Sequence, residues 1–115
     1  MAKHLEYGKE TEDLALEWFL KKFPAQLVTR NYRCKMGELD IIFEQGRELI
    51  FVEVRARQAG AWVSGIESIG PKKLQRIRNT VNHFLVHYQG TAKKIRVDVL
   101  SWDGNTWTHL RNVWI

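Results

Sequence analysis

Residues 38–55, ELDIIFEQGRELIFVEVR, contain the pattern that decides the fold. Two runs rich in Ile, Val and Phe flank the segment EQGR, whose glycine suits a tight turn, so the stretch predicts a β-hairpin. With Gln45-Gly46 at the tip, three cross-strand pairs are expected: Phe43 with Glu48, Asp40 with Phe51, and Glu38 with Glu53.

One face of this hairpin is expected to carry several acids. Side chains alternate across a strand, which places Glu38, Asp40 and Glu53 on the same face, together with Arg55. Opposed acids destabilise a strand pair unless something neutralises them. Carboxylate oxygens are hard ligands, so the pattern favours Mg²⁺ or Mn²⁺ as the neutralising ion. The alternative is a solvated sheet face on which Arg55 is the counterion.

A helix is predicted before the hairpin, from about Tyr7 to Phe23, and Pro24 closes it. Glu12 falls in the middle of the apolar arc of this helix. Burying an unpaired carboxylate is costly, so Glu12 requires a cation, a hydrogen-bond partner or an opening to solvent. A simple salt bridge near the start of the helix is the alternative to a role in a metal site.

The remaining segments predict one further helix and three further strands. Helical spacing of apolar residues runs from about Pro71 to Tyr88, and strands are expected at residues 26–33, 95–102 and 106–110. This order is typical of an α/β or α+β sandwich in which helices pack on a mixed sheet. A chain of 115 residues supports a single domain, residues 1–115.

The positive charge is concentrated in one part of the chain. Residues 55–96 hold nine Lys or Arg and a single acid, a net charge of +8, whereas the rest of the chain has a net charge of −3. Such asymmetry suggests a polyanionic partner, although a merely uneven surface gives the same count. On the second helix Lys72, Lys73 and Arg76 lie largely away from the apolar stripe, where they are available to a phosphate backbone.

The composition also bears on the cellular compartment. No apolar run approaches the roughly 18–20 residues that a membrane-spanning helix needs, and the first residues lack the apolar core of a secretory signal. Cys34 is the only cysteine, so no intrachain disulfide can form. A cytoplasmic protein without a membrane partner is therefore expected.

Several motifs together carry a resemblance to a known family. They are GELDIIF at residues 37–43, FVEVRAR at residues 51–57, the helix with Gly8 and Glu12, the pair Lys73 and Arg76, and IRVDVL at residues 95–100. In this order they resemble the YraN family of uncharacterised bacterial proteins. That family is similar to archaeal Holliday-junction resolvases and to the PD-(D/E)xK nucleases. The resemblance implies an α/β, restriction-endonuclease-like sandwich with a mixed central β-sheet flanked by helices.

The same resemblance implies an active site and a reaction. Asp40 would be the motif aspartate, Glu53 the motif glutamate and Glu12 the helix-borne acid, the three together holding Mg²⁺ or Mn²⁺. Arg55 occupies the position of the motif lysine. The expected contacts to nucleic acid are Arg57, Lys72, Lys73 and Arg76. The implied protein is a Mg-dependent endonuclease that hydrolyses phosphodiester bonds in branched or structured DNA, and a homodimer would suit such a substrate.

Arg55 departs from the nuclease pattern. Arginine stays protonated at all usable pH values, so it cannot act as a general base. It can still steady a phosphate through a bidentate contact. The residue therefore leaves an alternative open, namely a non-catalytic nucleic-acid-binding module that keeps the nuclease fold. A protein-interaction domain whose acids and bases are merely solvated is the third hypothesis.

Overall fold

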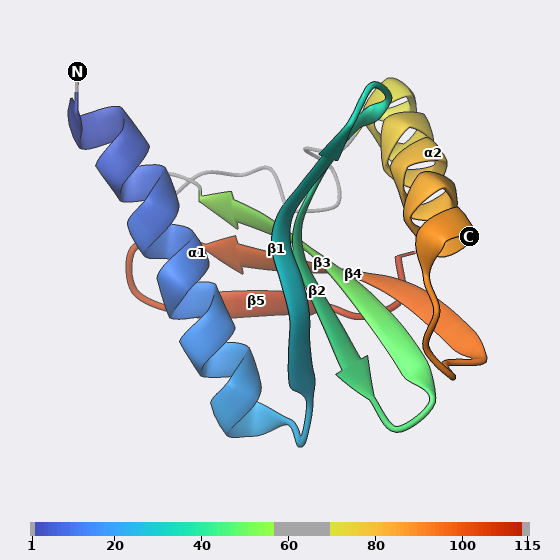
Figure 1. Ribbon diagram of the computed structural model, residues 1–115. Helices are drawn as coiled ribbons and strands as arrows, with labels where there is room; N and C mark the ends of the chain where they lie inside the picture. Colours follow the sequence, from blue (N-terminus) through green and yellow to red (C-terminus); the bar gives the residue numbers. More distant parts are fainter. Residues whose placement is uncertain (1, 57–69, 114–115) are drawn as a thin grey trace.

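Five strands and two helices make up the described part of the chain (Figure 1). The computed structural model describes residues 2–56 and 70–113, with side chains from residue 10 onward. In chain order the elements are α1 (Ala2–Lys22), β1 (Gln26–Cys34), β2 (Gly37–Gln45), β3 (Glu48–Ala56), α2 (Pro71–His87), β4 (Lys94–Trp102) and β5 (Trp107–Leu110). Every predicted helix and strand is confirmed, with α1 beginning earlier than the predicted Tyr7. No helix in the described ranges is long and apolar enough to cross a bilayer.

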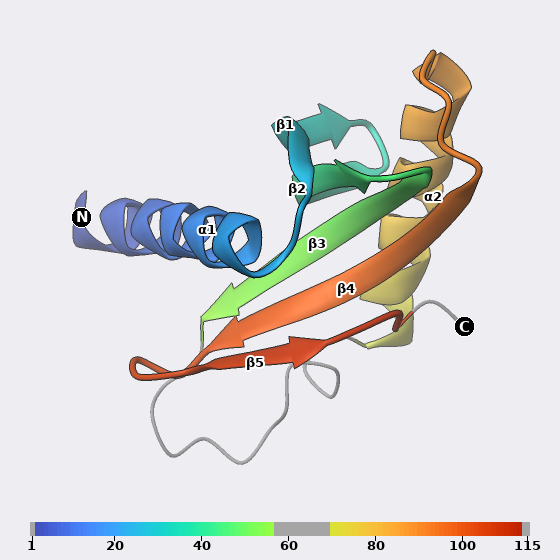
Figure 2. The same cartoon turned by 90° about the horizontal axis from the view of Figure 1, so that it is seen from below.

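The strands form a single mixed sheet in the order β1-β2-β3-β4-β5. Neighbouring strands are antiparallel except β3 and β4, which are parallel. Parallel neighbours need a crossover connection, and α2 lies within the segment that joins them. The two helices pack on opposite faces of the sheet (Figure 2). The result is an α/β fold compatible with the expected restriction-endonuclease-like sandwich.

The hairpin of β2 and β3 brings Asp40 and Glu53 together as predicted, but its register differs from the predicted one. Ile42 pairs with Phe51 and Phe43 with Ile50, so the predicted pairs are wrong by two residues. The turn is made by Gly46 and Arg47 rather than by Gln45-Gly46, with Gly46 in the left-handed region at a φ of 62°. A shift of two residues preserves the alternation of side chains. Asp40 and Glu53 therefore stay together as the sequence predicted, whereas the Glu38 carboxylate pairs with Arg33 of β1.

Each face of the sheet has its own apolar core. On the face covered by α2, Ile77 and Val81 pack with Phe51 and its neighbours on β2, β3 and β4. On the face covered by α1, the Phe19 ring stacks on that of Phe43, with 4.2 Å between ring centroids. Because both helices are anchored on the sheet, the side chains that α2 directs toward β3 have a fixed position.

Substituting Gly46 by alanine is expected to destabilise the fold through the backbone alone. An added Cβ would meet no atom within 4 Å, but the positive φ disfavours any residue with a Cβ by about 1–2 kcal/mol. Urea unfolding would measure the loss. Gly46→Asn is the matched control, since asparagine tolerates this conformation, and it is expected to lose less stability than Gly46→Ala. Equal losses for the two variants would contradict the explanation.

Candidate active site

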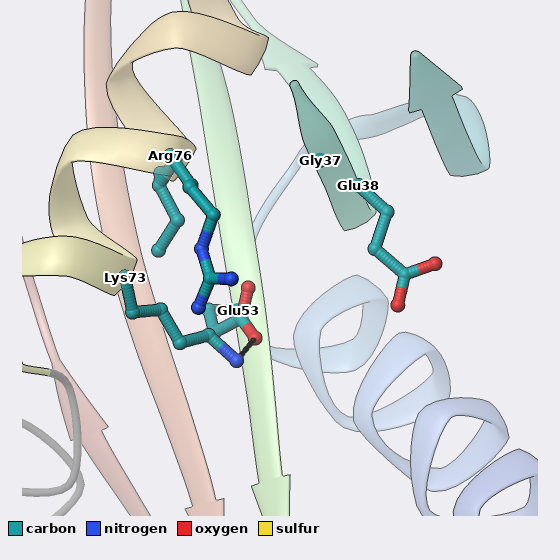
Figure 3. A pocket seen from close by; sticks show the side chains of 6 residues that line it. Gly37, Glu38, Glu53, Lys73 and Arg76 are labelled. Carbon is teal, nitrogen blue, oxygen red and sulfur yellow. Dashed lines mark ion pairs between the residues drawn. The ribbon is translucent and has the colours of Figure 1, made fainter. Parts of the chain in front are cut away.

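A pocket of about 250 Å³ opens where α2 crosses β2 and β3 (Figure 3). The residues that line it are Gly37, Glu38, Glu53, Lys73, Arg76 and Ile77. Gly37 allows the turn between β1 and β2 to approach the helix, because a Cβ there would lie 2.9 Å from the Thr80 hydroxyl. The pocket thus combines acids of two strands with cations of one helix.

Glu53 is the central acid of this pocket. It lies on β3, where the alternation of the strand turns it toward α2, and it is only 8% exposed. The Lys73 ammonium lies 3.2 Å from Glu53 Oε1, and Arg55 Nη1 lies 4.0 Å from the same oxygen. Figure 3 shows Lys73 and Arg76 extending from α2 toward this carboxylate.

Asp40 lies beside Glu53, just beyond the last registered pair of the hairpin, Ile41 with Val52. Asp40 Oδ2 accepts a hydrogen bond of 2.8 Å from the backbone N–H of Val54. The Asp40 and Glu53 carboxylates lie close enough that each influences the pKa of the other. Two carboxylates in such proximity need a shared proton or a cation between them.

The pKa values of both acids are raised. Burial raises the pKa of Glu53 to about 7, the charge of Asp40 adds to this effect, and Lys73 opposes it. Burial also raises the pKa of Asp40, against the lowering effect of the Val54 hydrogen bond. Raised values at two adjacent, partly desolvated acids are a common property of functional sites.

Glu12 lies near the acid pair but is held elsewhere. Its carboxylate lies 3.7 Å from Arg30, which also contacts Asp13 at 2.7 Å. Burial and the charge of Asp40 raise the pKa of Glu12, which places it within electrostatic range of the pair. In the described ranges no three acidic, histidine or cysteine side chains are close enough together to form a ready metal site. Glu12 thus forms a salt bridge with Arg30, which is the alternative that the sequence left open for it.

The acid pair nevertheless fits a hard divalent cation. Mg²⁺ in proteins is commonly held by one or two carboxylates, with water and phosphate oxygens completing its coordination. Asp40 and Glu53 supply two such carboxylates from adjacent strands, and the pocket beside them leaves room for water and phosphate. Glu12 would act on such an ion through water.

The predicted basic residues differ in their relation to the pocket. Lys73 and Arg76 line it, whereas Lys72, their neighbour on α2, is exposed. Arg57 lies outside the described residues. Glu38 also lines the pocket but points away from Lys73, and its carboxylate pairs with Arg33 at 3.0 Å.

A sequence model of the uncharacterised protein family UPF0102 matches residues 11–101, a span that includes every candidate residue above. The chain belongs to this family. It is the YraN family that the motifs GELDIIF and FVEVRAR indicated. Membership in UPF0102 confirms the resemblance and leaves the activity open, since the family is itself uncharacterised.

Curated UPF0102 proteins resemble the chain over nearly its whole length. One from Legionella pneumophila is 42% identical over 110 residues, which is 93% of this chain and 92% of the relative. One from Saccharophagus degradans is 43% identical over 88% of this chain and 86% of its own. A more distant one from Fusobacterium nucleatum is 32% identical over 94% of this chain and 90% of its own.

Sequence reasoning missed the contact between Lys73 and Glu53. The helical spacing placed Lys73 off the apolar stripe and so predicted a solvent-facing phosphate contact, yet its ammonium pairs with a buried acid. The only sequence signal is the position of Lys73 in the first turn of a helix that follows the FVEVRAR strand. That signal does not specify which strand residue the side chain reaches.

The metal-free protein is expected to lose stability as the pH rises from about 4.5 to about 7. Glu53 has a pKa of about 7 when folded against 4.5 for the unfolded reference, so the folded state keeps a proton that the unfolded state has lost. Stability linked to Glu53 is therefore full below pH 4.5 and is lost as the pH passes 7. Urea unfolding in EDTA across this range, for the wild type and Glu53→Gln, would measure it. A pH dependence unchanged in Glu53→Gln would contradict the assignment.

Proposed function

We propose that this UPF0102 protein is a metal-dependent endonuclease that hydrolyses phosphodiester bonds in branched or structured DNA. The observation that carries the proposal is the pocket in which the buried Glu53, with Asp40 beside it, lies against Lys73 and Arg76 of α2. Acids that can hold a divalent cation and bases that can hold a phosphate are the two parts that such hydrolysis needs. The net charge of +8 over residues 55–96 supports a nucleic-acid partner.

The proposed chemistry is a balanced hydrolysis. The oxygen of a water molecule bonds to phosphorus while the bond from phosphorus to one sugar oxygen breaks. The proton of the water passes through solvent to the leaving oxygen, which gives one phosphate end and one hydroxyl end. Mg²⁺ or Mn²⁺, when bound, lowers the pKa of a coordinated water and offsets the charge that develops on the phosphate.

The residues of the chain have distinct roles in this proposal. Asp40 and Glu53 hold the cation, and Glu12 contributes through water. Arg76 and Arg55 contact non-bridging phosphate oxygens, for which a guanidinium is well shaped. The proposal includes a homodimer, since a two-fold junction presents two equivalent strands to be cut. It also includes a cytoplasmic location.

The direct test is cleavage of defined DNA by the purified protein. Four-way junction, splayed and linear duplexes are incubated with Mg²⁺, Mn²⁺ or EDTA. Metal-dependent cleavage of branched DNA in preference to linear duplex is expected. Failure to cleave any of these substrates in either metal, together with salt-sensitive binding, would contradict the proposal. It would favour the non-catalytic nucleic-acid-binding module that Arg55 suggests.

DNA binding is expected to depend on Lys72 in a sequence-independent way. Removing a cation that neutralises one phosphate lowers the slope of log affinity against log salt by about one. Lys72→Ala is therefore expected to reduce this slope in fluorescence anisotropy with EDTA present. Lys21→Ala, on the exposed side of α1, is the matched control and should leave the slope unchanged. If both variants gave the same slope, Lys72 would not be a contact to the DNA.

A further inference from the structure

Lysine and arginine are not equivalent beside a reacting phosphate. An ammonium is a compact charge with three donors, so one donor can hold a carboxylate while the others reach a water and a phosphate oxygen. A guanidinium is planar and directs its donors within that plane. At position 55 the nuclease resemblance implies a lysine, but β3 carries Arg55, whose Nη1 lies 4.0 Å from the carboxylate of Glu53.

A lysine does reach this carboxylate, from a different element. Lys73 Nζ lies 3.2 Å from Glu53 Oε1, closer than Arg55, and its side chain is 34% exposed, so the ammonium faces both the acid and the open pocket. The helix backbone that carries Lys73 is held in place, because Ile77 and Val81 anchor α2 in the core and Leu74 N–H bonds to the carbonyl of Gly70 in the first turn. Figure 3 shows the side chain running along the pocket wall to Glu53.

We propose that Lys73 is the catalytic lysine of this site, contributed by α2 instead of by β3. Its ammonium donates to Glu53 and presents its other donors to the attacking water and to a non-bridging oxygen of the scissile phosphate. The bond changes are those of the hydrolysis above: oxygen to phosphorus forms, and phosphorus to the leaving sugar oxygen breaks. This assignment rests on the proposed nuclease function.

The chain offers a matched pair of variants for the test. Lys73→Met and Lys21→Met each remove one lysine charge from a helix, but Lys73 contacts Glu53, whereas Lys21 lies on α1 and pairs with the exposed Glu17. The rate constant for cleavage of junction DNA is measured under single turnover at saturating protein with Mn²⁺, and the Kd for DNA is measured in EDTA. Removing one preorganised donor typically costs about 10²–10³-fold in rate. Lys73→Met is expected to lose this much in rate, whereas Lys21→Met is expected to keep both its rate and its Kd.

A second measurement needs no DNA. The Mn²⁺-induced rise in melting temperature reports metal binding by the acids alone. Lys73→Met is expected to keep or enlarge this rise, because the ammonium that shares Glu53 is gone. Lys73→Gln replaces the ammonium with a neutral polar group and should behave like Lys73→Met. Agreement between the two variants would show that the result does not come from a folding defect in one of them.

The outcomes separate the lysine assignment from the nuclease proposal. A wild type that cleaves, with Lys73→Met and Lys21→Met retaining equal rates, overturns the role of Lys73 and leaves the nuclease standing. Loss of the Mn²⁺ response in both Lys73 variants also overturns it, since Lys73 would then only support the metal site. A wild type that does not cleave in either metal overturns both. A tenfold gain in rate for Arg55→Lys would return the role to position 55.

Discussion

Replacing Asp40 by asparagine or Glu53 by glutamine is expected to abolish DNA cleavage. Each change keeps the size of the side chain but removes one of the two carboxylates that would hold the cation. A bound divalent ion contributes several kcal/mol to the stabilisation of a reacting phosphate, so a loss on the order of 10³-fold or more is expected. Single-turnover cleavage of junction DNA in Mg²⁺ and in Mn²⁺ is the measurement.

The same two variants are expected to fold at least as well as the wild type. Burial raises the pKa of both acids, so their ionisation opposes folding near neutral pH, and a neutral amide removes that cost. Activity would therefore fall while the melting temperature without metal stays level or rises. Mn²⁺ should raise the melting temperature of the wild type but not of either variant. These opposite directions distinguish a lost metal site from a damaged fold.

Glu17→Gln is the control for these substitutions. It makes the same change at an exposed position of α1, where Glu17 pairs with Lys21 at 3.8 Å. It should leave both cleavage and the Mn²⁺ response unchanged. Cleavage that survives equally in the wild type, Asp40→Asn and Glu53→Gln would come from a contaminating nuclease, and the proposed site would be wrong.

The acid face was predictable from the sequence because it depends on strand alternation alone. A hairpin tip displaced by one position shifts every pair by two residues, and an even shift leaves Asp40 and Glu53 on the predicted face. The register itself was not predictable from the string EQGR. Both Gln45-Gly46 and Gly46-Arg47 would place a glycine in the turn. The turn at Gly46 and Arg47 is the one that aligns the long apolar runs of both strands.

The contact between Lys73 and Glu53 could not be predicted, since it depends on how α2 docks on the sheet. Helical periodicity gives the face of a helix that meets the core, but not its displacement along a strand. That displacement is set by Ile77 and Val81 in the core and by the close approach of Gly37 to Thr80. Lys73 lies at the border of the apolar stripe. The position in which the helix docks therefore decides whether such a side chain faces solvent or reaches the pocket.

A second buried acid, Asp98 on β4, has the opposite electrostatic character. It is the structural partner of an arginine, because Arg96 Nε lies 3.1 Å from its carboxylate. His109 Nε2 at 2.8 Å and the backbone N–H of Asn112 at 2.9 Å complete its partners, and it is fully buried. Burial alone raises the pKa of Asp98, but these hydrogen bonds outweigh it and hold the pKa below its usual value.

Asp98→Ala is accordingly expected to be strongly destabilising. It would leave the guanidinium of Arg96, itself 9% exposed, without its main counterion, and breaking a buried pair from one side typically costs about 3–5 kcal/mol. Urea unfolding at pH 6 is the measurement. Glu48→Gln is the matched control, because Glu48 contacts the same guanidinium at 3.2 Å but is 30% exposed, and about 1 kcal/mol or less is expected there.

The effect of Asp98 is expected to depend on pH in a definite direction. Its folded pKa lies below the unfolded value of 3.8, so the stability it contributes is complete above that value and is lost as the pH falls through the folded pKa. The stability difference between the wild type and Asp98→Ala should therefore be constant between pH 5 and 6 and shrink below about pH 4. Ionisation of Asp40 and Glu53 has the opposite effect on the stability of the fold. The chain thus contains one carboxylate that stabilises the fold when it is ionised, and two whose ionisation opposes folding until a cation neutralises them. A difference for Asp98→Ala that grows on acidification would contradict the assignment of Asp98 as a structural anion.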